Sequence, residues 1–290
     1  MNDTPATTLR LAIGDYPHTL PLKRGEIASP WLKLDFVEVK PMHTAFKPMV
    51  RQHAYDASEM ALVTCLQGKI YNKGLQLLPA AMLARFQHGT VLFNAERGKL
   101  APAELPGRRI GLRSYSQTTG AWVRGILEND YRVDFSRVQW VTFEDGHLAE
   151  YRDPAGVIRA RPDQDMTKML IAGELDAAIY GAAMPDDPRL QSVIPDPEAA
   201  ALAWYRKHGV VPVNHMVVVT EALARSNPKA VAELYRLLQA GKTAAGLPAA
   251  GAIDTAPFGR DANRPGLEML IFYAAQQGLI PRRLEVDELW

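Results

Sequence analysis

The sequence predicts an α/β protein built from two lobes with a cleft between them. Short apolar runs alternate with longer segments of helical period along its 290 residues, which is typical of α/β domains. Strand-rich blocks fall at 9–93 and 105–180, and a β-like run at 210–219 returns the chain to the first block. Two passages of the chain between the lobes place a cleft at their junction, where small ligands usually bind.

The first block begins with a strand at 9–13 that runs into a polar loop at 14–18. Further strands are expected at 32–39, 75–78 and 90–93. After Met42, the side chains of Phe46, Met49 and Val50 recur with the spacing of one helical face.

The second block starts at a turn that enters a strand within 105–112. It continues with a helix at 117–129, a strand at 138–142, a loop-rich segment at 144–164, a helix at 164–172 and a buried strand ending at 180. After the run at 210–219, helices are expected at 221–240 and 264–277. Lobe 1 is therefore expected to comprise 1–100 plus 205–290, and lobe 2 to comprise 101–204.

Composition excludes several classes of protein. With 47% hydrophobic and 22% charged residues, the chain is neither disordered nor fibrous. The 33 basic and 32 acidic residues leave a net charge of +1, which argues against nucleic acid or a membrane surface as a partner. Cys65, the one cysteine, lies in an apolar run and is expected in the core. The first ten residues have no leader-like pattern, so we expect a cytoplasmic protein.

Most classical motifs are absent. The sequence has no G-x-G-x-x-G, H-E-x-x-H or G-x-S-x-G, and Gly241-Lys242-Thr243 lacks the earlier glycine of a phosphate loop, since Arg236 occupies that position. None of the seven histidines pairs with another at i+3 or i+4, so no helix-borne metal site is expected. A site assembled from distant histidines stays open.

A few polar residues remain as candidates. Ser116 precedes a predicted helix, where it would cap the first turn or help bind a carboxylate there. Ser58 and Glu59 either cap a helix or face the cleft. His88 at a strand entrance and His215 within an apolar strand are either structural or functional.

Several segments together resemble the 4,5-dihydroxyphthalate decarboxylase family. They are collinear and span nearly the whole chain: YDASEM at 55–60, LPGRRIGL at 105–112, WVRGIL at 122–127, VQWVT at 138–142, GELDAA at 173–178, GVVPVNH at 209–215, and the tail from Asn263 through Gln277 to Arg283. The resemblance implies a type II periplasmic-binding-protein-like fold. It also implies a decarboxylase of a hydroxylated aromatic diacid that acts in phthalate degradation without a cofactor.

Such a reaction needs a base for a ring hydroxyl, an acid for the ring carbon and donors for a second carboxylate. On this resemblance we expect His88 or His215 as the base and Glu59, with a raised pKa, as the acid. The substrate-binding set is expected to comprise Asp15, Tyr16, Ser58, Arg85, Arg113, Tyr115, Ser116, Gln117, Thr118, Thr119 and Tyr180.

The sequence departs from the family pattern at the expected cleft. Ser114 stands where the family usually has a carboxylate, and Arg85 directly precedes Phe86, closer to the Phe–x–His element than is usual. A non-enzymatic binding protein for an aromatic carboxylate therefore remains the alternative, because a scaffold does not fix function. An enzyme of the menaquinone-precursor type fits the motifs less well. The oligomeric state is left open.

Overall fold

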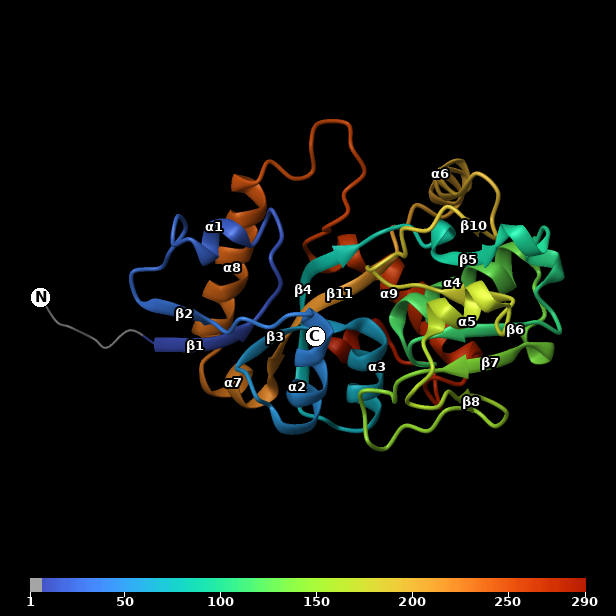
Figure 1. Ribbon diagram of the computed structural model, residues 1–290. Coiled ribbons are helices and arrows are strands. Elements are labelled where there is room, and N and C mark those ends of the chain that lie inside the picture. The colour runs from blue at the N-terminus through green and yellow to red at the C-terminus, as the bar shows by residue number, and fades with distance from the viewer. Residues whose placement is uncertain (1–6) are drawn as a thin grey trace, which may run out of the picture.

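The computed structural model describes residues 7–290 and consists of two α/β lobes lying side by side (Figure 1). The expectation that no leader is present rests on a segment of which residues 1–6 lie outside the described part. Within residues 7–290, none of the helices combines the length and the apolar character needed to cross a lipid bilayer.

Lobe 1 is built on a five-stranded sheet with the order β2-β1-β3-β11-β4. Its strands are β1 (Thr7–Ala12), β2 (Leu32–Phe36), β3 (Ala57–Ala61), β4 (Leu75–Ala84) and β11 (Val213–Thr220). β1 runs parallel to β2 and β3, whereas β11 inserts antiparallel between β3 and β4. The late strand β11 thus lies inside the first sheet, between β3 and β4, and the chain returns to lobe 1 as the sequence predicts.

Helices cover both faces of this sheet. They are α1 (Leu20–Lys23), α2 (Phe46–Gln52), α3 (Leu62–Ile70), α7 (Glu221–Ser226) and α8 (Pro228–Ala244). One face packs against Leu234, Leu237 and Leu238 of α8, and the other against Phe46 and Met49 of α2. The single helix expected at 221–240 is two helices, because Asn227 caps α8 and Pro228 begins it.

Lobe 2 is built on a six-stranded sheet with the order β10-β5-β9-β6-β7-β8. The strands are β5 (Val91–Asn94), β6 (Arg109–Leu112), β7 (Gln139–Thr142), β8 (Ile158–Arg159), β9 (Ala177–Ile179) and β10 (Leu190–Ser192), and the helices are α4 (Thr118–Tyr131), α5 (Met166–Ala172) and α6 (Pro197–His208). Short 3₁₀ turns complete both lobes: η1 (Met42–Ala45), η2 (His88–Thr90), η3 (Ala95–Arg97), η4 (Pro102–Glu104), η5 (Phe135–Arg137) and η6 (Val286–Leu289).

The chain passes between the sheets at different points from those expected. β5 pairs with β9 and β10, so the first passage lies between Ala84 and Val91 and not near residue 100. α6 stays with lobe 2, where Trp204 and His208 hydrogen-bond to Asp130 of α4. The return passage therefore follows α6, at 209–212, and not residue 204.

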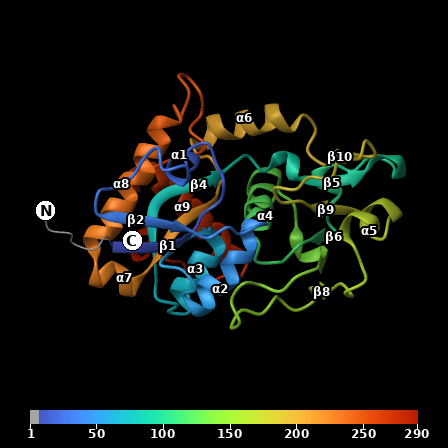
Figure 2. The ribbon, with the colours of Figure 1, turned by 60° about the vertical axis from the view of Figure 1, so that its left-hand side comes forward.

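The C-terminal helix α9 (Arg260–Gln276) joins the two lobes. Tyr273 of α9 packs edge-on against Trp122 of α4, with 5.8 Å between the ring centroids. Gly125 of α4 leaves room for the Tyr273 ring, because a Cβ atom there would overlap it. This contact fixes α4 at the junction of the lobes, which is its position in Figure 2.

Candidate active site

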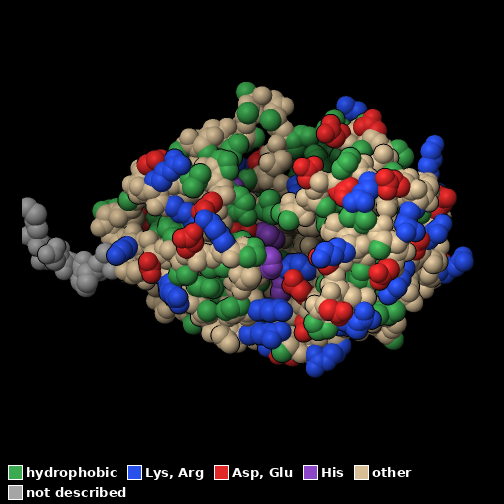
Figure 3. Space-filling model, viewed as in Figure 1, with side chains coloured by type: hydrophobic (Ala, Val, Ile, Leu, Met, Phe, Trp, Pro, Cys, Tyr) green, Lys and Arg blue, Asp and Glu red, His purple; other side chains and the backbone are tan. Residues whose placement is uncertain are grey.

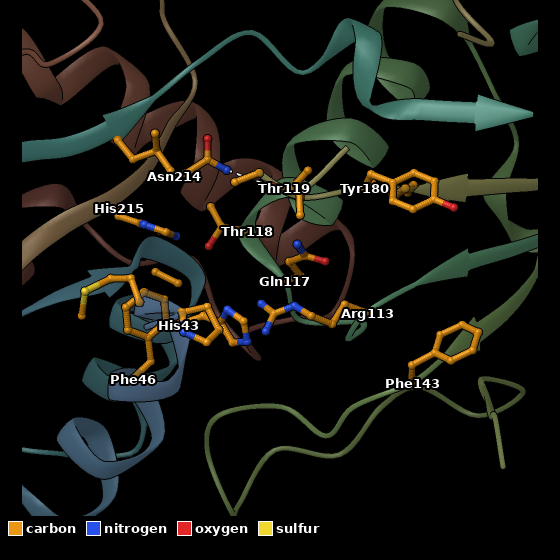
Figure 4. A pocket seen from close by; sticks show the side chains of 18 of the residues that line it. His43, Phe46, Arg113, Gln117, Thr118, Thr119, Phe143, Tyr180, Asn214 and His215 are labelled. Atoms are coloured by element: carbon orange, nitrogen blue, oxygen red, sulfur yellow. Dashed lines mark hydrogen bonds between the residues drawn. The ribbon is translucent and has the colours of Figure 1, made fainter. Parts of the chain in front are cut away.

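The cleft between the lobes holds a cavity of about 500 Å³. Histidine side chains show in the hollow between the lobes (Figure 3), and Figure 4 gives a close view of the side chains around it. Its lining comes from both lobes: Tyr16, Pro41, Met42, His43, Phe46, Ala61, Leu83, Arg85, Arg113, Gln117, Thr118, Thr119, Phe143, His147, Gln164, Asp165, Met166, Ile179, Tyr180, Gly181, Ala182, Ala183, Asn214 and His215.

Glu59 lies on the central strand β3, fully buried behind this wall. One of its carboxylate oxygens accepts hydrogen bonds from the Tyr16 hydroxyl and from His215 Nδ1, each at 2.6 Å, and the other accepts from the Gly14 N–H at 3.0 Å. Burial alone would raise the pKa of Glu59, but the bonds from His215, Tyr16 and Gly14 together hold it below its ordinary value. Glu59 is therefore a carboxylate, and the Nδ1 of His215 carries a hydrogen.

A distortion of β11 brings two neighbouring side chains to the cleft. Successive side chains of a regular strand point to opposite faces, yet both Asn214 and His215 line the cavity. The pairing of β11 with β4 shifts register between Val213 and His215 and again between His215 and Met216. Such an irregularity re-aims side chains, as β-bulges do beside active sites.

Arg85 follows β4 and brings a cation to the wall of the cleft. Its Nη2 donates to the Thr119 hydroxyl at 3.5 Å, and its Nε is buried with no hydrogen-bond partner in the described part of the chain. Within residues 7–290 no carboxylate lies close enough to pair with it, and burial lowers the pKa of Arg85 from its ordinary value. Asn214 Nδ2 also donates to the Thr119 hydroxyl, at 3.0 Å. The cleft thus offers a partly desolvated guanidinium group as a binding partner for an anion.

The first turn of α4 faces the same region through Thr118 and Thr119. The N-terminal N–H groups of a helix have no partner within the helix, and they favour anions. The expected cap at Ser116 is wrong: Gln117 is the N-cap, because it is the residue with extended backbone directly before the helix (φ −61°, ψ 132°). Ser116 is buried, with its hydroxyl 3.5 Å from that of Ser114.

Two histidines that the sequence analysis did not single out also line the cleft. His43 lies on η1 of lobe 1, and Arg113 of lobe 2 extends toward it (Figure 4). Burial, and then the charge of Arg113, lowers the pKa of His43. Burial likewise lowers the pKa of His147 to about 3, so this ring is neutral near pH 7. Nothing in the sequence marks either residue, since η1 and the loop that carries His147 are far apart in the chain and only the fold brings them together.

Some expected site residues line the cleft and others do not. Those that line it are Tyr16, Arg85, Arg113, Gln117, Thr118, Thr119, Tyr180 and His215. Glu59 touches it only through His215 and Tyr16, and its lowered pKa opposes the role of ring acid.

Three other expected residues make their contacts outside the cavity. Asp15 pairs with Lys23 at 2.5 Å outside the cavity, and Ser58 is buried on β3, where it donates to the Glu59 carbonyl. Tyr115 packs over the buried Arg124 guanidinium.

His88 is not a base for a substrate in the cleft. Its ring is buried against Trp204, and neither ring nitrogen has a hydrogen-bond partner among the residues that the structure describes. Burial lowers the pKa of His88 to about 4. Among residues 7–290, no three His, Cys, Asp or Glu side chains are grouped as ligands for a metal ion.

The sheets, the crossings and the interlobe cleft define a periplasmic-binding-protein-like fold. The alkanesulfonate-binding protein SsuA from Xanthomonas axonopodis pv. citri matches with a TM-score of 0.57 and 14% identity, covering 98% of both chains. The desulfurization enzyme DSZB matches with a TM-score of 0.52 and 13% identity, covering 98% of this chain and 96% of the other. Binding proteins and an enzyme share this fold, so the fold does not separate the two functions.

Sequence comparison is more specific. The chain is 31% identical over 211 residues to the 4,5-dihydroxyphthalate decarboxylase of Pseudomonas putida, covering 68% of this chain and 81% of that protein. It is 29% identical over 250 residues to the same enzyme of Comamonas testosteroni, covering 82% of this chain and 75% of that protein. No protein-family model matches. The chain belongs to the 4,5-dihydroxyphthalate decarboxylase family, which is a family of carboxy-lyases.

Proposed function

We propose that this protein decarboxylates a hydroxylated aromatic dicarboxylate of the 4,5-dihydroxyphthalate type to a dihydroxybenzoate and CO₂. One observation carries the proposal beyond family membership. A buried carboxylate, Glu59, orients a cleft-facing histidine, His215, and the same cavity holds Arg85, a cation with no ion-pair partner among residues 7–290. A proton carrier and an anion anchor in one cleft are what this reaction needs.

Direct loss of CO₂ from an aromatic ring would leave an unstable aryl anion. The easier route removes the proton of a hydroxyl ortho or para to the reacting carboxylate, which makes the carbon bearing that carboxylate basic. An acid protonates this carbon, and the bond to CO₂ then breaks as its electrons restore the aromatic ring. The phenolate regains a proton at the end, so one proton is consumed for each CO₂ released.

In this proposal Arg85 and the first turn of α4 hold the spectator carboxylate. His215, whose Nδ1–H donates to Glu59, delivers a proton from Nε2 to the ring carbon. Glu59 does not touch the substrate and is a positioning residue.

His43 accepts the hydroxyl proton, and the adjacent Arg113 stabilises the oxyanion that results. The lowered pKa of His43 keeps this ring neutral near pH 7, as a base must be.

The remaining wall of the cleft favours the step in which the reacting carboxylate leaves as neutral CO₂. Phe46, Ala61, Leu83, Met166 and Ile179 contribute apolar surface. A carboxylate placed there is poorly solvated, whereas the neutral CO₂ that it becomes is not penalised.

The proposal requires a small aromatic acid as the partner and no nucleic acid or membrane. We further propose a cytoplasmic location, since a chain with a single, buried cysteine gains nothing from an oxidising compartment.

The test compares 4,5-dihydroxyphthalate with phthalate, which lacks the hydroxyl groups. Only the first compound should yield product, and both should raise the melting temperature of the protein. Arg85→Ala should raise KM for the first compound about tenfold or more, because it removes a charged hydrogen bond, while Arg85→Lys should lie between. Arg137→Ala, at an exposed site, is the control. Stabilisation by both compounds without any turnover would instead indicate a binding protein.

A further inference from the structure

A loop of lobe 2 is fastened to lobe 1 beside the cleft. Residues 144–151 lie between β7 and β8. The Nε of Arg51, on α2 of lobe 1, donates to the His147 carbonyl at 2.6 Å, and its Nη2 donates to the Gly146 carbonyl at 3.3 Å. The hydroxyl of Thr64, on α3, lies 2.7 Å from His147 Nδ1. Lys73 of lobe 1 forms an ion pair with Glu150.

The same loop is anchored in lobe 2 beside a cleft residue. The carbonyl of Arg113 accepts hydrogen bonds from the N–H groups of Phe143 at 3.0 Å and Glu144 at 2.7 Å. The Arg113 side chain also pairs with Glu144 at 3.2 Å. The loop therefore starts beside Arg113, which lines the cleft, and contacts the opposite lobe further along.

The loop also contacts the proposed proton carrier through a series of rings. His147 lines the cleft and stands edge-on to Phe46, with ring centroids 5.5 Å apart. Phe46 in turn stands edge-on to His215, at 5.0 Å. A movement of this loop would thus alter the wall against which His215 packs.

These attachments lie away from the covalent passages between the lobes. In Figures 1 and 2 the loop beside β8 lies on the lower side of the molecule, and α6, which leads into the return passage, lies on the upper side. The lobes can rotate about the passages only if the contacts to Arg51, Thr64 and Lys73 break. The loop is thus placed to control access to the cleft.

We propose that residues 144–151 form a strap that holds the lobes together over the substrate, and that Arg51 is the positioning residue that fastens it. The strap must part for substrate to enter and for product to leave. Its effect on kinetics rests on the proposed function, whereas its effect on the distance between the lobes does not.

The lobe distance is measurable with two labels, because Cys65 is buried and is the one native cysteine. Lys33 on β2 and Gln191 on β10 are exposed and lie on different lobes, so Lys33→Cys and Gln191→Cys provide the labelling sites. With a spin label on each of these cysteines, pulsed electron–electron double resonance measures the distance between the lobes and so gives the populations of open and closed protein. Arg51→Ala should raise the open-to-closed ratio about tenfold or more, the effect of losing a charged hydrogen bond.

Thr64→Val is the second variant, since it removes one hydroxyl and keeps the shape of the side chain. It should shift the ratio in the same direction as Arg51→Ala but less. Arg51→Lys should restore part of the closed population. Arg206→Ala, on the exposed face of α6, is the matched control and should change nothing.

With 4,5-dihydroxyphthalate, the fastening variants should raise KM by about the factor by which the closed population falls. Unchanged distance distributions in folded Arg51→Ala or Thr64→Val would overturn the strap. If wild-type protein shows no turnover, the proposed function fails, and distances measured with bound phthalate still decide whether the strap exists. If Arg51→Ala does not fold, Thr64→Val decides it.

Discussion

Replacing Glu59 by Gln tests the central pair of the site. The substitution keeps the size of the side chain and removes its charge. His215 Nδ1, the Tyr16 hydroxyl and the Gly14 N–H all donate to this carboxylate, so the new amide NH₂ must face at least one donor. Hydrogen bonds to charged groups contribute about 1.5–3 kcal/mol. Since each 1.36 kcal/mol is a factor of ten in rate, kcat should fall roughly 10- to 150-fold.

KM should change little, because Glu59 does not line the cavity. The assay is steady-state decarboxylation followed by chromatography of the dihydroxybenzoate, with circular dichroism to verify folding. Glu233→Gln is the matched control, since this carboxylate also forms an ion pair, with Arg236 on α8, but does not line the cleft, and its effect should be below about threefold. A folded Glu59→Gln variant with wild-type kcat, or one altered only in KM, would refute the positioning role.

Three further predictions concern pH and stability. In the wild-type protein kcat/KM should decline on the acid side with a midpoint below pH 6.5, because the pKa of His43 is lowered from that value. His43→Gln should abolish this decline. The unfolded chain protonates His88 near pH 6.5 and the folded chain near pH 4, so stability is lost as the pH falls through this window. In urea melts His88→Phe should lessen that loss by up to about 1.4 kcal/mol per pH unit; equal slopes would contradict this. Gly125→Ala should lower the melting temperature, because a Cβ atom there would lie 2.0 Å from the Tyr273 ring, and an overlap this severe costs more than the gain in helix propensity of about 1 kcal/mol. Gly68→Ala, where a Cβ meets nothing closer than 3.7 Å, should be neutral or stabilising.

Most of the architecture follows from local patterns in the sequence. The apolar run that becomes β11 predicted the return of the chain to the first sheet, and the helical period of 117–129 predicted α4. The predicted lobe boundary at residue 100 was wrong, because the short apolar sequence of β5 would fit either sheet. Only its pairing with β9 and β10, which depends on distant residues, assigns it to lobe 2.

The site was less predictable, for a comparable reason. Arg113, Thr119 and His215 belong to recognisable segments, so their type and position pointed to the cleft. His43 lies on a short 3₁₀ turn and His147 on a loop, and neither segment has a pattern that marks a site. Asn214 shares the cleft wall with His215 only because β11 shifts register. For Glu59, the sequence indicated a functional carboxylate but not whether it acts on the substrate or orients another side chain. The three donors around it make it a partner of His215 rather than a ring acid.

Turnover of 4,5-dihydroxyphthalate in deuterium oxide tests the central claim most directly. Purified, chelator-treated protein is incubated with the substrate, released CO₂ is quantified, and the dihydroxybenzoate is analysed by NMR. The account predicts one CO₂ for each product molecule, with deuterium on the ring carbon that lost the carboxylate. Binding of the compound, seen as a raised melting temperature, without any CO₂ or product would contradict the decarboxylase.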